Sequence, residues 1–209
     1  MVRKTKEDAS ITRNHILDAA VECFIEQGVS QTTLDAIAQR AGVTRGAIYW
    51  YFENKADILS AMTERLACPL QEQAAAGGLL DDPLAFLRAA TKDFLDRVAH
   101  DQNFYRLIEI FWHRCEYVGE MAELRRKNLD EGEDYIDILL RAFKLAKERG
   151  QIGTALTPHQ ATIALVSLTT GLVFNWTKSN RQMFPMENYG KVILDAFWDA
   201  LRPNDANNT

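Results

Sequence analysis

The chain has 209 residues, enough for one large domain or for a small domain joined to a larger one. Hydrophobic residues make up 47%, an ordinary share for a globular protein, and no stretch approaches the ~18 uncharged apolar residues of a membrane-spanning helix. The net charge is −5, but residues 1–55 are neutral, so the acidic balance of the remainder leaves this segment able to bind DNA.

The cysteines and histidines are scattered along the sequence. Cys23, Cys68 and Cys115 form no C-x-x-C pair, and the four histidines lie far apart. We therefore expect no disulfide framework, no metal site and no cofactor, with each cysteine a small apolar residue of the core. The charged N-terminus lacks the apolar segment of a signal peptide, which predicts a cytoplasmic protein.

Apolar residues at helical spacing recur along the chain, whereas strand signals are nearly absent. In the first 55 residues the spacing predicts three helices. The first ends at Gly28, the second is capped by Thr32 or Thr33, and the third runs from the cap Thr44 through Phe52. A fourth helix, capped by Asn54, is expected to run toward residue 77.

Two cap-and-proline pairs begin helices in the second part of the chain, Asp82-Pro83 and Thr157-Pro158. The expected helices cover about residues 83–99, 104–115, 120–149, 158–177 and 187–201. The fold class is all-α, with about nine helices. A helix-turn-helix domain at 1–55 would be followed by a helical ligand-binding and dimerisation domain at 56–203 and a disordered tail at 204–209.

The order helix, glycine turn, short helix is typical of the helix-turn-helix, whose second helix enters the major groove of DNA. Neighbouring residues on a helix are about 100° apart, so three successive aromatics cannot share one face. Ile48 and Phe52, four residues apart, are the natural core pair. The outward-facing side chains would come from Thr44, Arg45, Tyr49, Trp50 and Tyr51.

Residues 12–59, TRNHILDAAVECFIEQGVSQTTLDAIAQRAGVTRGAIYWYFENKADIL, resemble the DNA-binding domain of the TetR family of repressors. The resemblance implies that Thr33 and Lys55 meet phosphates, Lys55 with help from a helix dipole. It places residues 44–46 against base edges or backbone, with the missing side chain of Gly46 allowing close approach, and residues 49–51 against the sugar-phosphate rim. The implied DNA contacts are Thr33, Thr44, Arg45, Gly46, Tyr49, Trp50, Tyr51 and Lys55.

Several of these positions leave a second interpretation open. Arg45 is either a DNA contact or a solvated surface residue, and Trp50 is either a contact or a cap on the domain core. Tyr51 departs from the family, in which this position is often His, and so loses the option of a positive charge. Asp35 favours its helix dipole but repels phosphate, so we expect it to point away from DNA or to weaken binding. The N-terminal basic residues form either a DNA-binding arm or a solubilising tail: Arg3, Lys4 and Lys6.

A narrower resemblance concerns the rest of the chain. The segments MVRKTKED at the N-terminus, IEIFWHRCEYVGEM at 108–121 and GLVFNW at 171–176 are similar to repressors of multidrug efflux pumps of the Acr type. This implies a pocket for lipophilic compounds, although each residue concerned is equally explained as ordinary core. Aromatic side chains mixed with a few polar ones suit such a pocket. The implied pocket residues are Phe94, Ile108, Trp112, Leu139, Val166, Thr170 and Phe174.

The predicted function is a ligand-responsive repressor of a multidrug efflux pump operon. It would bind palindromic operator double-stranded DNA as a homodimer and be released by a small lipophilic inducer, without a membrane partner. No G-x-S-x-G, H-E-x-x-H or Gly-rich phosphate loop is present, so we expect no enzyme. The alternatives are a TetR-like regulator of metabolic or signalling genes that responds to a specific metabolite, and activation in place of repression.

Two expectations concern dimerisation and release. The apolar content of the helices at 158–177 and 187–201 exceeds what one buried face needs, which predicts that they form the dimer interface. Pro69 either ends the fourth helix or kinks it. A kink there would be a pivot between the DNA-binding and ligand-binding parts.

Overall fold

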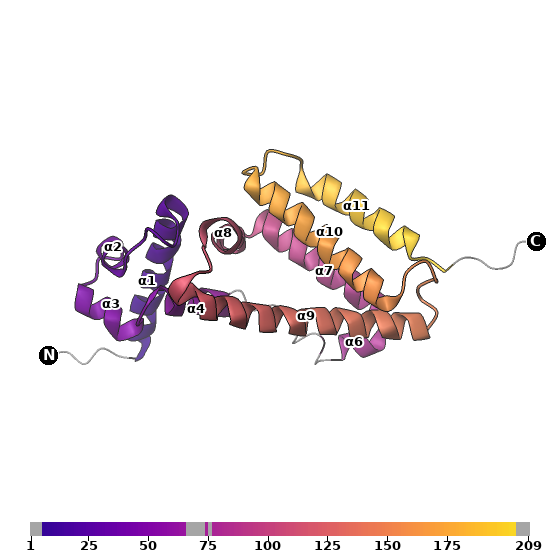
Figure 1. Ribbon diagram of the computed structural model, residues 1–209, viewed down its shortest axis with the longest axis horizontal. Coiled ribbons are helices and arrows are strands. Elements are labelled where there is room, and N and C mark those ends of the chain that lie inside the picture. Colours follow the sequence, from indigo (N-terminus) through magenta and orange to yellow (C-terminus); the bar gives the residue numbers. More distant parts are fainter. Residues whose placement is uncertain (1–5, 66–73, 75–76, 204–209) are drawn as a thin grey trace, which may run out of the picture. The chain divides into compact units, whose positions relative to one another are not determined.

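The computed structural model describes residues 6–65, 74 and 77–203, and every regular element among them is a helix (Figure 1). The all-α class is therefore confirmed. The chain divides into two compact units, residues 1–67 with 106–128 and residues 68–105 with 129–209. The first unit thus extends beyond the expected domain at 1–55, because a distant segment of the chain packs into it. Pro69 and the expected tail at 204–209 lie outside the described residues.

The first unit begins with four helices, α1 (Lys6–Gln27), α2 (Leu34–Arg40), α3 (Arg45–Tyr51) and α4 (Lys55–Arg65). Their shared core includes the fully buried side chains of Phe24, Ile37 and Ile48. Gly28 follows α1 with a φ angle of +79°, and Gly42 follows α2 with a φ angle of +66°. Both angles are left-handed, a conformation that favours glycine. The helix-turn-helix order expected from the sequence is present.

The first unit is completed by residues 106–128. They hold the end of α8 (Gln102–Glu109), a π-helical turn η1 (Ile110–Arg114), a short 3₁₀ turn η2 (Gly119–Met121) and the start of α9 (Ala122–Glu148). Ile110 and Phe111 join the core of α1–α4, and the Val29 N–H donates to the Arg114 carbonyl at 2.9 Å.

Cys115 was expected at the end of a helix over about residues 104–115 and instead follows η1 in an extended conformation. Burial raises the pKa of its thiol to about 11 and also raises the pKa of Cys23. Both thiols are therefore neutral at physiological pH and poor nucleophiles, as expected of small residues that pack in or against a core.

The second unit holds α6 (Gly78–Asp81), α7 (Pro83–His100), α10 (Pro158–Lys178) and α11 (Met186–Ala200), with the start of α8 and most of α9. Helices α7, α10 and α11 pack against one another (Figure 1). Both predicted cap-and-proline pairs are present. Asp82 accepts the Ala85 N–H at 3.0 Å, and Thr157 forms a reciprocal capping box with Gln160.

Helix α6 was not expected, because the sequence suggested that α4 reaches this region. Ten α-helices are present among the described residues, against about nine predicted. None of the helices in that part of the chain is both long enough and apolar enough to cross a membrane.

Candidate DNA-binding surface and ligand cavity

Two threonines cap the helices of the helix-turn-helix. The Ala36 N–H donates to Thr33 Oγ1 at the start of α2, and the Ala47 N–H donates to Thr44 Oγ1 at the start of α3, both at 3.1 Å. Thr32 is buried and donates to the Gly28 carbonyl instead. Of the two threonines that the sequence offered as the cap of α2, Thr33 is therefore the cap. A threonine that accepts at its oxygen keeps a hydroxyl hydrogen to donate, which suits a phosphate contact.

The faces of α3 divide as the spacing predicted for Ile48, Tyr49, Trp50 and Phe52, whereas Tyr51, which was expected to face outward, packs against the core. Ile48 is fully buried in the core and Phe52, the residue after α3, is nearly so. Tyr49 and Trp50 are exposed, with 72% of Trp50 accessible, which excludes the interpretation of Trp50 as a cap on the core. Tyr51 is half-buried, packs against the core and meets the Trp50 ring edge-on with centroids 4.5 Å apart. A DNA contact by Tyr51 stays a prediction.

Arg45 projects from the first turn of α3 and is paired with an acid of α2. Its Nε lies 3.2 Å from Asp35 Oδ1, and its guanidinium carbon is 5.9 Å from the centre of the Tyr49 ring. Asp35, expected to face away from the DNA-binding surface or to weaken binding, is thus joined to the residue that the resemblance places against base edges.

Lys55 has a structural role that the sequence did not reveal. Its Nζ donates to the Val29 carbonyl at 2.7 Å and to the Ser30 carbonyl at 3.3 Å, so it fastens the start of α4 to the loop between α1 and α2. Asn54 caps α4, as predicted, by accepting the Asp57 N–H. A phosphate contact by Lys55 stays a prediction.

Gly46→Ala is expected to separate stability from DNA binding. Gly46 is exposed on α3, and a Cβ placed there meets no atom within 4 Å. Alanine therefore fits, and its higher helix propensity raises the free energy of unfolding by up to about 1 kcal/mol. If DNA approaches this backbone closely, the added methyl lowers operator affinity at the same time. Thermal unfolding and fluorescence anisotropy measure the two effects, and a raised melting temperature with unchanged affinity would contradict a close approach.

The residues expected to line a ligand pocket are distributed over both units. Ile108 and Trp112 belong to the first, where Trp112 packs against the core of α1–α4. The other five belong to the second unit. Leu139 is buried in α9, whereas Thr170 and Phe174 are exposed on α10. Their role in ligand binding stays a prediction.

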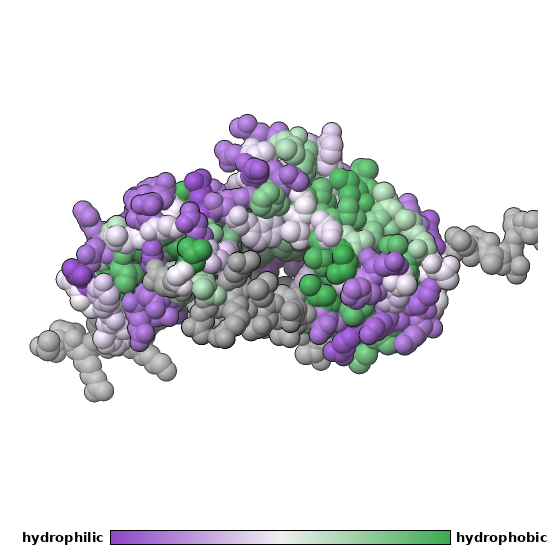
Figure 2. All heavy atoms as spheres, in the orientation of Figure 1, coloured by the Kyte–Doolittle hydropathy of each residue, from purple (hydrophilic) through white to green (hydrophobic). Residues whose placement is uncertain are grey.

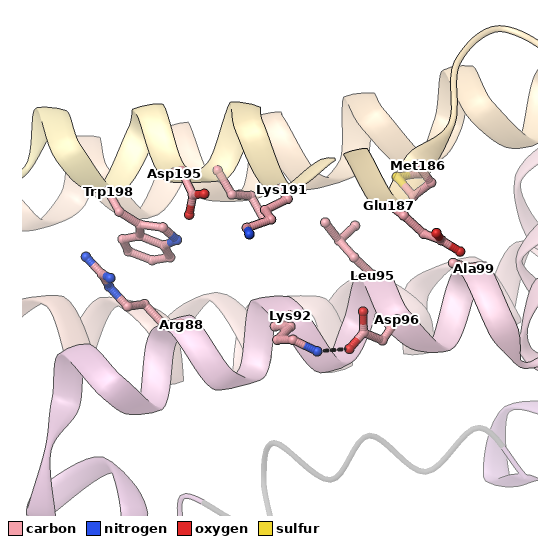
Figure 3. A pocket seen from close by; sticks show the side chains of 11 residues that line it. Arg88, Lys92, Leu95, Asp96, Ala99, Met186, Glu187, Lys191, Asp195 and Trp198 are labelled. Atoms are coloured by element: carbon pink, nitrogen blue, oxygen red, sulfur yellow. Dashed lines mark hydrogen bonds and ion pairs between the residues drawn. The ribbon is translucent and has the colours of Figure 1, made fainter. Parts of the chain in front are cut away.

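A cavity of about 380 Å³ lies within the second unit, between α7 and α11 (Figure 3). Its apolar lining comes from Leu95, Ala99, Met186, Leu194 and Trp198. Six charged side chains also line it: Arg88, Lys92, Asp96, Glu187, Lys191 and Asp195. None of the seven predicted pocket residues lines this cavity. Sequence reasoning missed this site because its apolar residues repeat at the same helical spacing as core residues.

The charged residues around the cavity are partly neutralised within the protein. Lys92 pairs with Asp96 on the next turn of α7, and the Arg88 guanidinium lies 5.5 Å from the centre of the Trp198 ring. Figure 3 shows the side chains of the two helices pointing toward each other across the gap. Although six of the eleven lining residues are charged, most of the lining surface is apolar, as is usual for a small-molecule site. The volume also lies within the usual range for such sites.

Apolar side chains are also exposed along α10 and α11, and Figure 2 shows apolar surface over these two helices. Ile163 and Phe174 of α10 are 44% and 38% exposed, and Tyr189 and Val192 of α11 are 54% and 66% exposed. On α11, Tyr189 and Val192 lie about 140° and about 160° around the helix from Leu194, which lines the cavity. The helix therefore has two separate faces, one toward the cavity and one apolar and uncovered.

Two family descriptions match the chain. "Bacterial regulatory proteins, tetR family" matches residues 16–62, and "MAATS-type transcriptional repressor, C-terminal region" matches residues 82–203. The chain belongs to the TetR family. It is 38% identical to the HTH-type transcriptional regulator AcrR of Shigella flexneri over 181 residues, which span 84% of this chain and 83% of AcrR.

Two solved structures extend the likeness of this TetR-family chain to its full fold. NalD, the secondary repressor of the MexAB-OprM multidrug efflux pump in Pseudomonas aeruginosa, is 32% identical with a TM-score of 0.86, covering 95% of this chain and 100% of NalD. SmeT in complex with triclosan is 29% identical with a TM-score of 0.79, covering 95% of both chains.

These matches confirm two expectations from the sequence. This TetR-family chain is a transcriptional repressor and not an enzyme, and it resembles repressors of multidrug efflux. Residues 16–62, which carry the family match, include the exposed face of α3.

Proposed function

We propose that the chain represses a multidrug efflux pump operon in the cytoplasm, binds palindromic operator DNA as a homodimer, and is released by lipophilic compounds. The exposed face of α3 carries the proposal. A seven-residue helix, fixed by a threonine cap and a buried Ile48, presents Arg45, Tyr49 and Trp50 outward. Arginine and aromatic side chains on a helix of this kind suit base edges and the sugar-phosphate rim of a major groove.

The DNA contacts we propose follow from where each group lies. Arg45 and the backbone at Gly46 face base edges, and Tyr49 and Trp50 contact the flanking backbone. The hydroxyls of Thr33 and Thr44 lie at the capped starts of α2 and α3, where the helix dipole adds to the attraction for phosphate. The DNA contacts of Tyr51 and Lys55 have the least support, because Tyr51 packs against the core and Lys55 binds a backbone carbonyl within the domain.

The dimer we propose uses α10 and α11. Their exposed apolar side chains leave water when the same face of a second copy covers them, as in an isologous two-fold interface. A two-fold dimer presents two copies of α3, so the operator is a palindrome whose half-sites lie roughly one helical turn, or a small multiple of it, apart.

The inducer we propose is a lipophilic compound bound in the second unit. The support is the cavity between α7 and α11, which is large enough for a small molecule and has a mostly apolar lining surface. Triclosan, the compound bound in the SmeT complex, is the probe that this likeness suggests.

The experiment begins with selection of binding sites from randomised duplexes, which we expect to return a palindrome. Triclosan is then titrated against the purified protein with and without the selected operator. Differential affinity of ~1–3 kcal/mol between the two conformations weakens DNA binding about 5- to 150-fold, and DNA must weaken triclosan binding by the same factor. A sequence without two-fold symmetry, or release of DNA without reciprocal loss of triclosan affinity, would contradict the proposal.

Two variants locate the ligand. Ala99→Trp fills the cavity from α7, whereas Ala89→Trp places the same side chain on an exposed position of α7 outside it. We expect only the first to lower triclosan affinity, with DNA affinity unchanged in both. If Ala99→Trp leaves triclosan affinity unchanged, the cavity between α7 and α11 is not the triclosan site.

A further inference from the structure

An acidic side chain lies within the surface that we propose for DNA binding. Asp35 on α2 approaches Arg45 on α3 with Oδ1 3.2 Å from Nε, and the two side chains are 53% and 72% exposed. Stability does not account for this pair, because exposed ion pairs contribute only about 0–1 kcal/mol. A carboxylate at this place also repels phosphate.

The atoms used by the pair determine what Arg45 can still do. A guanidinium has five N–H donors in one plane, and the contact to Asp35 engages the Nε side of that plane. The two terminal Nη groups form the opposite edge, with parallel N–H bonds that match O6 and N7 of guanine. The ring of Tyr49, 5.9 Å from the guanidinium carbon, borders the same group.

We propose that Asp35 is a positioning residue that holds Arg45 with its terminal edge toward the DNA, so that Arg45 recognises guanine bidentately in each operator half-site. This rests on the proposed DNA contact of Arg45 and adds the base that it reads and the residue that orients it. A long arginine side chain loses rotational freedom when it binds, and the carboxylate restricts that freedom beforehand.

The proposal predicts opposite effects on affinity and on selectivity. Without the carboxylate, Arg45 still attracts phosphate, so affinity for unrelated DNA stays the same or rises. The planar alignment is lost, so discrimination between guanine and adenine at the contacted position falls. A purely structural role for Asp35 would lower binding to all sequences together.

The test compares the wild-type protein with Asp35→Ala, Asp35→Asn and Arg45→Ala on three duplexes at one salt concentration. The first duplex is the selected operator and the third is an unrelated sequence. The second is the operator with adenine in place of guanine at the position where the Arg45→Ala variant no longer prefers guanine. With the exchange made in one half-site, we expect the wild type to discriminate about 5- to 150-fold between the first two. Asp35→Ala should bring the ratio close to that of Arg45→Ala, and Asp35→Asn, which keeps an acceptor oxygen, should retain more of it.

A matched control is available within the same domain. Glu26→Ala breaks the pair that Glu26 of α1 makes with Arg40 of α2, at 2.8 and 2.5 Å, and removes the same charge. It should leave the discrimination intact, and circular dichroism should show all variants folded.

Two outcomes have different meanings. If Arg45→Ala changes neither affinity nor preference, the proposed DNA contact of Arg45 is itself wrong. Suppose instead that Arg45→Ala loses the guanine preference. If Asp35→Ala then keeps that preference, or if Asp35→Ala lowers affinity equally on all three duplexes, Asp35 does not position Arg45 and this inference is overturned.

Discussion

Replacing Arg45 or Tyr49 with alanine is expected to remove most operator binding while the protein stays folded. Both side chains project from α3 and neither belongs to the core, so their loss removes DNA contacts and not packing. A base-reading arginine contributes about 1–3 kcal/mol at each half-site. Two copies in a dimer lose about 2–6 kcal/mol, which is a fall in affinity of about 30-fold or more.

Fluorescence anisotropy on the selected operator measures this loss, and far-ultraviolet circular dichroism checks that helicity is unchanged. Arg88→Ala is the matched control, because Arg88 also lies over an aromatic ring, Trp198, but in the second unit. It should bind the operator as the wild type does. Unaltered affinity in both Arg45→Ala and Tyr49→Ala would remove α3 from the DNA interface.

The helices of this protein were predictable where their signals are local in the sequence. A threonine or aspartate cap acts on an N–H three residues later, so Thr44, Asp82 and Thr157 can be identified without knowing the fold. The core pair of α3, Ile48 and Phe52, follows from helical spacing in the same way. Asn54 was likewise predictable as the cap of α4. Helix α6 was not predictable in this way, because it has no side-chain cap.

Side-chain partners distant in sequence were not predictable. The ammonium of Lys55 reaches carbonyls 25 and 26 residues earlier, and no local pattern distinguishes it from a lysine directed at phosphate. Arg181 takes a left-handed φ of +65° without being glycine, and its guanidinium carbon lies 3.7 Å from the centre of the Tyr105 ring. Such contacts depend on how helices pack, which residue spacing alone does not determine.

The candidate ligand site shows the same division. The sequence indicated aromatic and apolar residues on helices of the ligand-binding domain. Helical spacing predicts which residues share a face of a helix, but not which other helix packs against that face. Thr170 and Phe174 were expected in a pocket and lie on an exposed face of α10. Leu95 and Trp198, which no sequence pattern singled out, line a cavity.

Val192→Asp is expected to convert the repressor to a monomer with little operator affinity. Val192 is 66% exposed on α11 beside exposed Tyr189, on the face that we propose covers itself in a two-fold dimer. Burying a valine contributes about 1.5–3 kcal/mol, and an aspartate in its place must be buried as an unpaired charge in both subunits. Because two linked half-site contacts bind more tightly than one by a factor of about 10²–10⁴, loss of the dimer lowers operator affinity by a similar factor.

Light scattering at micromolar concentration and anisotropy on the selected operator measure the two effects of Val192→Asp together. Ala89→Asp introduces the same charge on an exposed position of α7 and should leave both the dimer and DNA binding intact. A monomeric wild type would refute the dimer, and a Val192→Asp variant that remains dimeric would place the interface elsewhere. Weak DNA binding by a monomeric Val192→Asp variant, with α3 unaltered, would show that the operator is recognised through two coupled copies of the helix and not through one.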